Sequence, residues 1–463
     1  MQVGSPAPHN PRRGGDLRRG ERQENPPGGS YRFEHGRTWP QECEITMKLT
    51  RRALVAAAAT SGALAQSAAA AAQASPASPR LPAKADFAKM PFTYLDAGST
   101  HPMPLGARAA LEEYLRYKTQ DGTVSNYSVG AKETAMIAKF GELVGAAPDE
   151  LSLIQSTTMG ENLVIRALGI PESGGRIVTD ALHFFGSFYT YGELGKAGMD
   201  VVTLPMTQDG RIDMGQMAAA VNDRTKLVSI SAVSTTNGFQ HDLKAVCDLA
   251  HAHGAYVYVD MVHAVGVTPI DLRAAGVDFA ASSSYKWLMG DFGLGFLYVR
   301  KEIQDKVKRP WWGYHQINAF KSHVFPYDEP GPGAATYGMS PDAAGTFAMG
   351  TTSWTGVVQL DYSLGLIKDL GVPAIEAARQ PLIKAVQTEL RGRGYQPMTP
   401  PDSRTALVAF ALKDARAKLG DLMKAANIRM TVSQNRFRVS LAVFNDMNDV
   451  DRLLSALPRT PPA

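Results

Sequence analysis

Short runs of apolar and β-branched residues alternate with amphipathic stretches through most of this 463-residue chain. Helical periodicity marks the stretches between the runs, such as the one from Leu243 to His253. Strands that alternate with helices predict a mostly parallel sheet covered by helices on both faces. We therefore expect an α/β fold whose ligands bind at the carboxyl ends of the strands. The predicted strands lie at 151–155, 176–179, 200–204, 226–231, 255–260 and 295–299.

The composition changes after Pro310, where a loop rich in glycine, proline and tyrosine is predicted. We predict a large domain at 90–340 and a small C-terminal α/β domain at 341–463. A helical run and two strands are expected in the tail, at 355–369, 407–412 and 437–443.

The first 74 residues differ from the rest. Residues 1–46 are rich in proline, glycine and arginine and show no period, so we expect them to be disordered. Residues 47–74 begin with a positive segment that contains Arg51 and Arg52, and continue as an uncharged alanine-rich run. This arrangement is typical of an export signal, and the paired arginines resemble the twin-arginine type.

We expect the twin-arginine export machinery to recognise residues 47–74 and the mature protein to be periplasmic or secreted. The alternative is a membrane anchor. The run is long enough to span a bilayer but only weakly apolar, so no stable anchor is predicted. Because such a signal belongs at an N-terminus, we expect translation to start at Met47. Residues 1–46 would then be an upstream extension wrongly assigned to the protein.

Charge and cysteine content exclude two classes of function. The net charge of +4 falls within the first 74 residues, so the remaining chain has no basic footprint for nucleic acid. The two cysteines, Cys43 and Cys247, are too few for a disulfide framework and lack the spacing of a metal site. We expect neither a nucleic-acid partner nor a bound metal.

Two charged residues follow predicted strands. Lys286 lies among apolar and small residues, which predicts partial desolvation and a lowered pKa, as in a Schiff-base lysine. The alternative is a solvated lysine in a loop. Asp260 ends a buried strand, where a carboxylate is costly without a cation such as a protonated pyridine nitrogen. The alternative is an aspartate that caps the next turn.

Hydroxyl and imidazole side chains stand at similar places. Thr157 and Thr158 lie between a strand and a helix, where hydroxyls and free N–H groups bind phosphate, although plain N-capping is the commoner reason. His183 and His263 also follow strands, and a partly buried structural role is the alternative for His183. Each signal is weak alone, but the ordered set is specific.

In this order the motifs resemble the class V group of fold-type-I pyridoxal 5'-phosphate enzymes. That group includes cysteine desulfurases, kynureninase and isopenicillin N epimerase-like proteins. The resemblance implies a mostly parallel sheet of the seven-stranded type between helices, pyridoxal 5'-phosphate as the cofactor, and a homodimer. The matching segments span nearly all of 92–457 and read YLDAGSTHPMP, STTMGENL, TDALHF, VSTTNG, VDMVHAVG, SSYKWLMG, FAMGTTS and FRVSLAVFN.

The resemblance assigns a role to each candidate around the cofactor ring. Lys286 would form the Schiff base and move the substrate's α-proton. Asp260 would pair with the pyridine nitrogen, His263 would contact the 3-oxygen, and His183 would stack on the ring.

The remaining roles concern the phosphate and the substrate. Arg438 resembles the arginine that clamps the substrate carboxylate. Thr351 resembles the threonine that reaches the phosphate across a dimer interface, and Tyr285 is expected to be a donor beside the Schiff base. The phosphate would be held by Thr157, Thr158 and Ser283.

Positions at which this sequence differs from the group narrow the choice of reaction. The persulfide-forming cysteine of cysteine desulfurases has no counterpart in 427–436, which disfavours that chemistry. Thr235 stands where several members have an asparagine, and the segment 285–287 (YKW) is closest to the epimerase-like branch. We predict an exported enzyme that acts at the α-carbon of an amino acid or amino-bearing metabolite, a small-molecule substrate, as a transaminase or an isopenicillin N epimerase-like enzyme. The alternatives are a carbon–sulfur lyase without a catalytic cysteine, a periplasmic siderophore-tailoring enzyme and a non-enzymatic binding protein.

Overall fold

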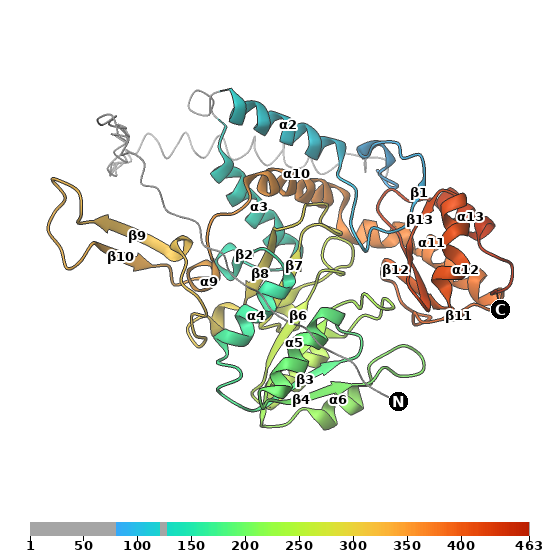
Figure 1. The fold of residues 1–463 in the computed structure, drawn as a ribbon, viewed down its shortest axis with the longest axis horizontal. Helices are drawn as coiled ribbons and strands as arrows, with labels where there is room; N and C mark the ends of the chain where they lie inside the picture. The colour runs from blue at the N-terminus through green and yellow to red at the C-terminus, as the bar shows by residue number, and fades with distance from the viewer. Residues whose placement is uncertain (1–79, 121–126, 463) are drawn as a thin grey trace, which may run out of the picture. The chain divides into compact units, whose positions relative to one another are not determined.

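A seven-stranded sheet forms the centre of the chain in the computed structural model, which describes residues 80–120 and 127–462. The strand order is β2-β8-β7-β6-β5-β3-β4, and all of these strands run in one direction except β8. The predicted mostly parallel α/β sheet is confirmed (Figure 1). The strands are β2 (Leu151–Ile154), β3 (Arg176–Asp180), β4 (Asp200–Leu204), β5 (Thr225–Ser231), β6 (Tyr256–Asp260), β7 (Phe279–Ser283) and β8 (Gly295–Val299).

Helices cover both faces of this sheet because successive strand residues point to opposite sides. Val178 and Val228 pack on one face with α3, α7 and α10, whereas Ile177 and Leu227 pack on the other with α4 and α5. The helices of this part are α2 (Leu105–Thr119), α3 (Val129–Val144), α4 (Thr157–Ala167), α5 (Phe185–Lys196), α6 (Met214–Ala220), α7 (Leu243–Ala252), α8 (Leu272–Ala275), α9 (Ala343–Phe347) and α10 (Trp354–Leu370).

A second hydrophobic cluster lies in the C-terminal part, around a four-stranded antiparallel sheet of order β11-β12-β15-β14. The two strands predicted there correspond to β12 and β15. The β1 strand (Thr93–Tyr94) pairs with β13 and so ties the start of the described chain to this part. The remaining elements are α11 (Val372–Gly392), β11 (Gln396–Pro397), β12 (Leu407–Ala411), α12 (Ala415–Ala425), β13 (Ile428–Arg429), β14 (Thr431–Val432), β15 (Arg436–Ser440) and α13 (Met447–Ala456).

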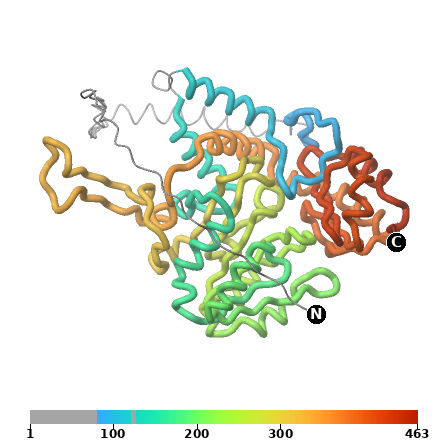
Figure 2. Tube along the Cα trace, viewed as in Figure 1, coloured from blue at the N-terminus to red at the C-terminus, as the bar shows by residue number. Residues whose placement is uncertain are grey.

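The loop predicted after Pro310 contains a β-hairpin, so that prediction was wrong for 317–322 and 335–339. Strands β9 (Ile317–Ser322) and β10 (Ala335–Met339) pair antiparallel and project as a ribbon (Figure 2). Most of its residues are exposed on both faces, so the sequence lacks the apolar–polar alternation that identifies half-buried strands. Several aromatic side chains of the ribbon are exposed, namely Phe320, Phe325, Tyr327 and Tyr337.

The predicted signal at 47–74 and the extension at 1–46 lie outside the described residues. Within the described ranges, no helix combines the length and the apolar character needed to cross a bilayer. The division into domains near residue 340 stays a prediction.

Candidate active site

The carboxyl edge of the large sheet carries most of the predicted site residues. The β6 strand ends at Asp260, and β7 ends at Ser283, three residues before Lys286. The β3 strand ends at Asp180, and His183 follows in the next turn. The three strands run in one direction, so their carboxyl ends share one edge. The structure thus gathers these side chains at one end of the sheet.

Lys286 lies beside a histidine whose tautomer is defined by its hydrogen bonds. Lys286 Nζ is 2.9 Å from His263 Nε2, and the indole N–H of Trp287 donates to His263 Nδ1 at 3.3 Å. Burial lowers the pKa of His263 well below its ordinary value, so the ring carries a single proton. Because Nδ1 accepts from Trp287, we assign that proton to Nε2. The Nε2–H group can then donate to Lys286 whenever the lysine is a neutral amine.

The surroundings of Lys286 also disfavour its charged form. The residue is 7% exposed, and this burial lowers its pKa to about 8, although Asp260 acts in the opposite direction. The positive charge of Arg438 lowers the pKa further. A neutral amine is the form that attacks a carbonyl carbon to make a Schiff base. The desolvated lysine expected from the sequence is therefore present.

Asp260 is a buried carboxylate with no ion-pair partner within 4.0 Å in the described part of the chain. Its Oδ1 accepts a hydrogen bond from the backbone N–H of Val262 at 2.9 Å, and no ion pair to it is present among the described residues. Burial raises the pKa of Asp260, and the charges of His183 and Lys286 oppose that effect. A buried carboxylate without a counter-ion is costly. A protonated pyridine nitrogen would supply the missing cation, so this position fits pyridoxal 5'-phosphate.

The N-terminus of α4 supplies the candidate phosphate site. Ser156 caps the helix through its hydroxyl, and the N–H of Thr157 donates to Ser283 Oγ at 3.2 Å. Thr158 lies in the same first turn. Gly160 allows α4 to lie against the sheet, because a Cβ at this position would come within 2.8 Å of a β2 side chain. The two threonines and the serine are thus held together where N–H groups favour an anion.

Arg438 lies near Lys286, but its guanidinium already has partners. Its Nη1 donates to the carbonyl and hydroxyl oxygens of Thr235, at 3.0 and 2.9 Å. Its Nη2 donates to Ser99 Oγ and Thr431 Oγ1, and Asp96 lies 3.6 Å away. Only Nε is buried without a hydrogen-bond partner in the described chain. A substrate carboxylate would therefore bind at Nε and displace one of the two hydroxyl groups at Nη2.

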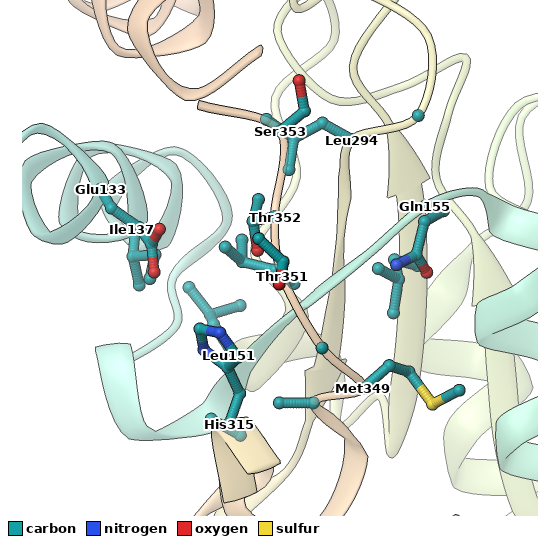
Figure 3. A pocket seen from close by; sticks show the side chains of 16 residues that line it. Glu133, Ile137, Leu151, Gln155, Leu294, His315, Met349, Thr351, Thr352 and Ser353 are labelled. Carbon is teal, nitrogen blue, oxygen red and sulfur yellow. The ribbon is translucent and has the colours of Figure 1, made fainter. Parts of the chain in front are cut away.

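Thr351 is the predicted site residue that this chain does not bring to the others. Its hydroxyl bonds to the hydroxyl of Tyr314 at 2.7 Å. It lines a separate cavity of about 470 Å³. Figure 3 shows Thr351 between Glu133 on α3 and Gln155, the residue that follows β2 by one position. Its expected role at a phosphate across a dimer interface stays a prediction.

Tyr285 contacts neighbouring residues through both its ring and its backbone. Its ring stacks on Phe292, with centroids 4.3 Å apart, and its carbonyl accepts the backbone N–H of His101. The Lys286 amine lies 5.6 Å from the centre of the Tyr285 ring. These contacts fix the backbone next to the lysine.

Two residues of the site were not predicted from the sequence. Trp287 defines the tautomer of His263, and Glu161 is a buried carboxylate 3.1 Å from His183 Nε2. A charged residue in the apolar pattern of the α4 helix was the available signal for Glu161. No sequence signal paired it with His183, because their contact depends on how α4 packs against the sheet.

The fold and this arrangement of side chains define a class, the fold-type-I enzymes that depend on pyridoxal 5'-phosphate. Residues 93–453 match the model of the aminotransferase class V family. The chain therefore belongs to that family, and it is an enzyme with pyridoxal 5'-phosphate as its cofactor.

Similar proteins come from sequence and structure comparison. A cysteine desulfurase of Klebsiella pneumoniae is 26% identical over 391 residues, which cover 80% of this chain and 93% of the relative. A probable cysteine desulfurase of Methanothermobacter thermautotrophicus is 28% identical and covers 61% of this chain and 68% of its own length. The cysteine desulfurase CsdA of Escherichia coli has a similar crystal structure, with a TM-score of 0.70 and 22% identity over 81% of this chain and 97% of that one. The cystine C–S lyase C-DES has a TM-score of 0.69 at 18% identity, covering 79% and 97%.

Proposed function

We propose that this enzyme removes the α-proton of an amino acid or amino-bearing metabolite and so acts as a transaminase or an epimerase. The observation that carries the proposal is the buried amine of Lys286, which lies 2.9 Å from His263 Nε2 and has its pKa lowered to about 8. The carboxylate of Asp260, which has no ion pair among the described residues, is close enough to act on that pKa. When bound, pyridoxal 5'-phosphate supplies an electron sink for the α-carbon.

The residues of the chain then have separate tasks. Lys286 would hold the cofactor covalently and, once released by the substrate amine, would take the α-proton at Nζ. Asp260 would keep the pyridine nitrogen protonated, and Arg438 would hold the substrate carboxylate. Thr157 and Thr158 at the N-terminus of α4, together with Ser283, would bind the phosphate.

A carbon–sulfur lyase is the second candidate, because relatives are named as cysteine desulfurases and one similar structure as a cystine C–S lyase. Transfer of sulfur through a protein persulfide is disfavoured here. Residues 427–436 contain no cysteine, and Cys247 is fully buried on α7 with its thiol pKa raised to about 12. Such a thiol neither ionises readily nor meets a substrate. A lyase on this chain would therefore release sulfide without a catalytic cysteine.

A panel of amino acids incubated with the cofactor-loaded protein separates these reactions. A transaminase converts the bound cofactor to its pyridoxamine form. An epimerase exchanges the α-hydrogen with deuterium from the solvent and leaves the cofactor unchanged. Release of sulfide from cysteine, or of cysteine persulfide from cystine, would favour the lyase. If none of the substrates changes the cofactor, exchanges hydrogen or is cleaved, the proposed enzyme function is wrong.

We also propose that the enzyme is exported through residues 47–74 and works as a homodimer outside the cytoplasmic membrane. The paired arginines at 51 and 52 support export. Thr351 lies apart from the other site residues of its own chain, and the β9–β10 ribbon exposes aromatic side chains, which supports association of two copies. Siderophore tailoring would be one role of an exported enzyme of this kind.

Protein recovered from outside the cytoplasmic membrane tests both the export and the homodimer. N-terminal sequencing is expected to begin close after residue 74, and light scattering is expected to give twice the mass of one chain. Finding residues 1–46 on the exported protein contradicts the signal assignment. A monomer contradicts the role proposed for Thr351.

A further inference from the structure

Glu161 is a buried carboxylate at the centre of a polar cluster. It is 4% exposed and lies on α4, whose neighbouring residues pack against the sheet. Its Oε1 lies 3.1 Å from His183 Nε2 and accepts from the hydroxyls of Tyr191 and Ser229, at 2.6 and 3.1 Å. Its Oε2 accepts from Ser187 at 2.7 Å. Four donors around one carboxylate stabilise its charged form.

His183 is the group that balances this charge. Among the described residues, it is the only basic side chain within 4.0 Å of Glu161. A carboxylate buried to this extent requires a counter-ion, since its own desolvation is costly. A histidine that is fully buried with such a partner meets that requirement only when both ring nitrogens carry protons.

The other charged and titratable groups that face His183 act in the same direction. Burial has the largest effect on His183 and lowers its pKa, but the hydrogen bond and the charge of Glu161 outweigh it, together with the charges of Asp260 at the end of β6 and Asp180 at the end of β3. The pKa of His183 is therefore raised above its ordinary value. Tyr191 on α5 stays protonated, because burial and Glu161 raise its pKa well above the ordinary value.

The hydrogen bonds also fix the plane of the imidazole. Its Nδ1 lies 2.8 Å from Ser231 Oγ on β5, and its Nε2 lies near both Glu161 on α4 and Ser229. Both nitrogens of the ring are therefore bound within the protein, on opposite edges. The ring cannot rotate or hand a proton to a substrate without breaking one of these bonds.

We propose that Glu161 is a positioning residue that keeps His183 as a fixed, doubly protonated imidazolium at the face where the cofactor ring binds. The placement of the cofactor there rests on the proposed function. A positive charge at this face favours the uptake of electrons from the substrate's α-carbon, as an electrostatic effect of a preorganised site. His183 would then act as a charged platform, and the transfer of protons would be left to Lys286.

Nuclear magnetic resonance of the full-length, cofactor-free protein labelled with [15N]histidine measures this directly. The chain has ten histidines, and His183→Gln identifies the signal. In the wild type, both nitrogens of His183 are expected to stay protonated at pH 7.5, above the ordinary histidine pKa of about 6.5. In Glu161→Gln, the midpoint of this titration is expected to fall by about one pH unit or more.

Ser187→Ala is the matched control, because Ser187 bonds to Glu161 but not to His183. Its His183 is expected to stay charged at pH 7.5. The proposal is overturned if wild-type His183 is neutral at that pH, a result that needs no variant to fold. It is also overturned if His183 stays equally charged in a folded Glu161→Gln protein. Failure of Lys286 to bind the cofactor would overturn the proposed function instead, and would leave the charge of His183 as measured.

Discussion

Replacing Lys286 with alanine is expected to remove the visible absorption band of the lysine-linked cofactor and to reduce turnover by roughly 10²–10⁴-fold for loss of the base alone. The geometry gives the reason. The amine is buried, its pKa is lowered to about 8, and it lies 2.9 Å from His263 Nε2, so its neutral, nucleophilic form is readily reached. Pyridoxal 5'-phosphate would still bind, because the phosphate site at the N-terminus of α4 and the carboxylate of Asp260 remain. Absorption spectroscopy before and after dialysis measures the loss of covalent attachment.

Lys244→Ala is the control for this substitution. Lys244 is an exposed lysine on α7 that pairs with Asp248, four residues further along the helix. Its removal is expected to leave the absorption band and the turnover of the wild type in place. A Lys286→Ala protein that retains the covalent band would show that another amine holds the cofactor, and the assignment of Lys286 would be wrong.

Replacing Asp260 with asparagine is expected to change stability and activity in opposite directions. Asparagine keeps the size of the side chain and an oxygen for the Val262 N–H, but removes the unpaired charge. The cofactor-free protein should therefore become more stable at neutral pH. Its midpoint of thermal unfolding should rise by roughly 2–4 °C for each kcal/mol gained. Turnover of the loaded enzyme should fall by roughly 10²–10⁴-fold, since loss of one partner of a buried ion pair costs about 3–5 kcal/mol.

The pH dependence of the stability gain checks its cause. Burial raises the pKa of Asp260 above the ordinary 3.8, so the unfolded chain ionises first as the pH rises. The charge of Asp260 therefore destabilises the folded wild type only above the pKa of this residue in the unfolded chain. Below that pH the stability advantage of the asparagine variant should vanish. Thermal unfolding of both proteins at pH 3 and pH 7 measures this. An advantage that persists unchanged at low pH would mean that packing, rather than charge, is the cause.

Much of the fold could be predicted because periodicity is a local signal. Each predicted strand of the large sheet is present, and the helix expected at 355–369 corresponds to α10. The β9–β10 ribbon was missed because its strands bury neither face, which leaves no alternation to detect. The direction of β8, antiparallel to its neighbours, depends on its connections across the sheet and has no pattern in the strand itself.

The candidate residues of the site could be predicted from the sequence, but their contacts could not. Strand ends identified Lys286, Asp260 and His183 as candidates, since ligands of such sheets bind at the carboxyl ends of the strands. The partners of these residues could not be predicted in the same way. Glu161 and His183 are 22 positions apart, and their contact depends on the tertiary packing of a helix and a loop. The occupied hydrogen-bond donors of Arg438 are likewise a property of the folded chain.

The β9–β10 ribbon has a thermodynamic consequence. Two paired strands without a covering layer are only marginally stable in water, because they bury too little apolar surface to offset the loss of conformational entropy. The exposed rings of Phe320, Phe325 and Tyr337 contribute little to stability until another surface covers them. The order of this segment and its association with such a surface are therefore linked equilibria. The measured strength of association would include the free energy needed to order the ribbon, so its apparent affinity would understate the contacts that it makes.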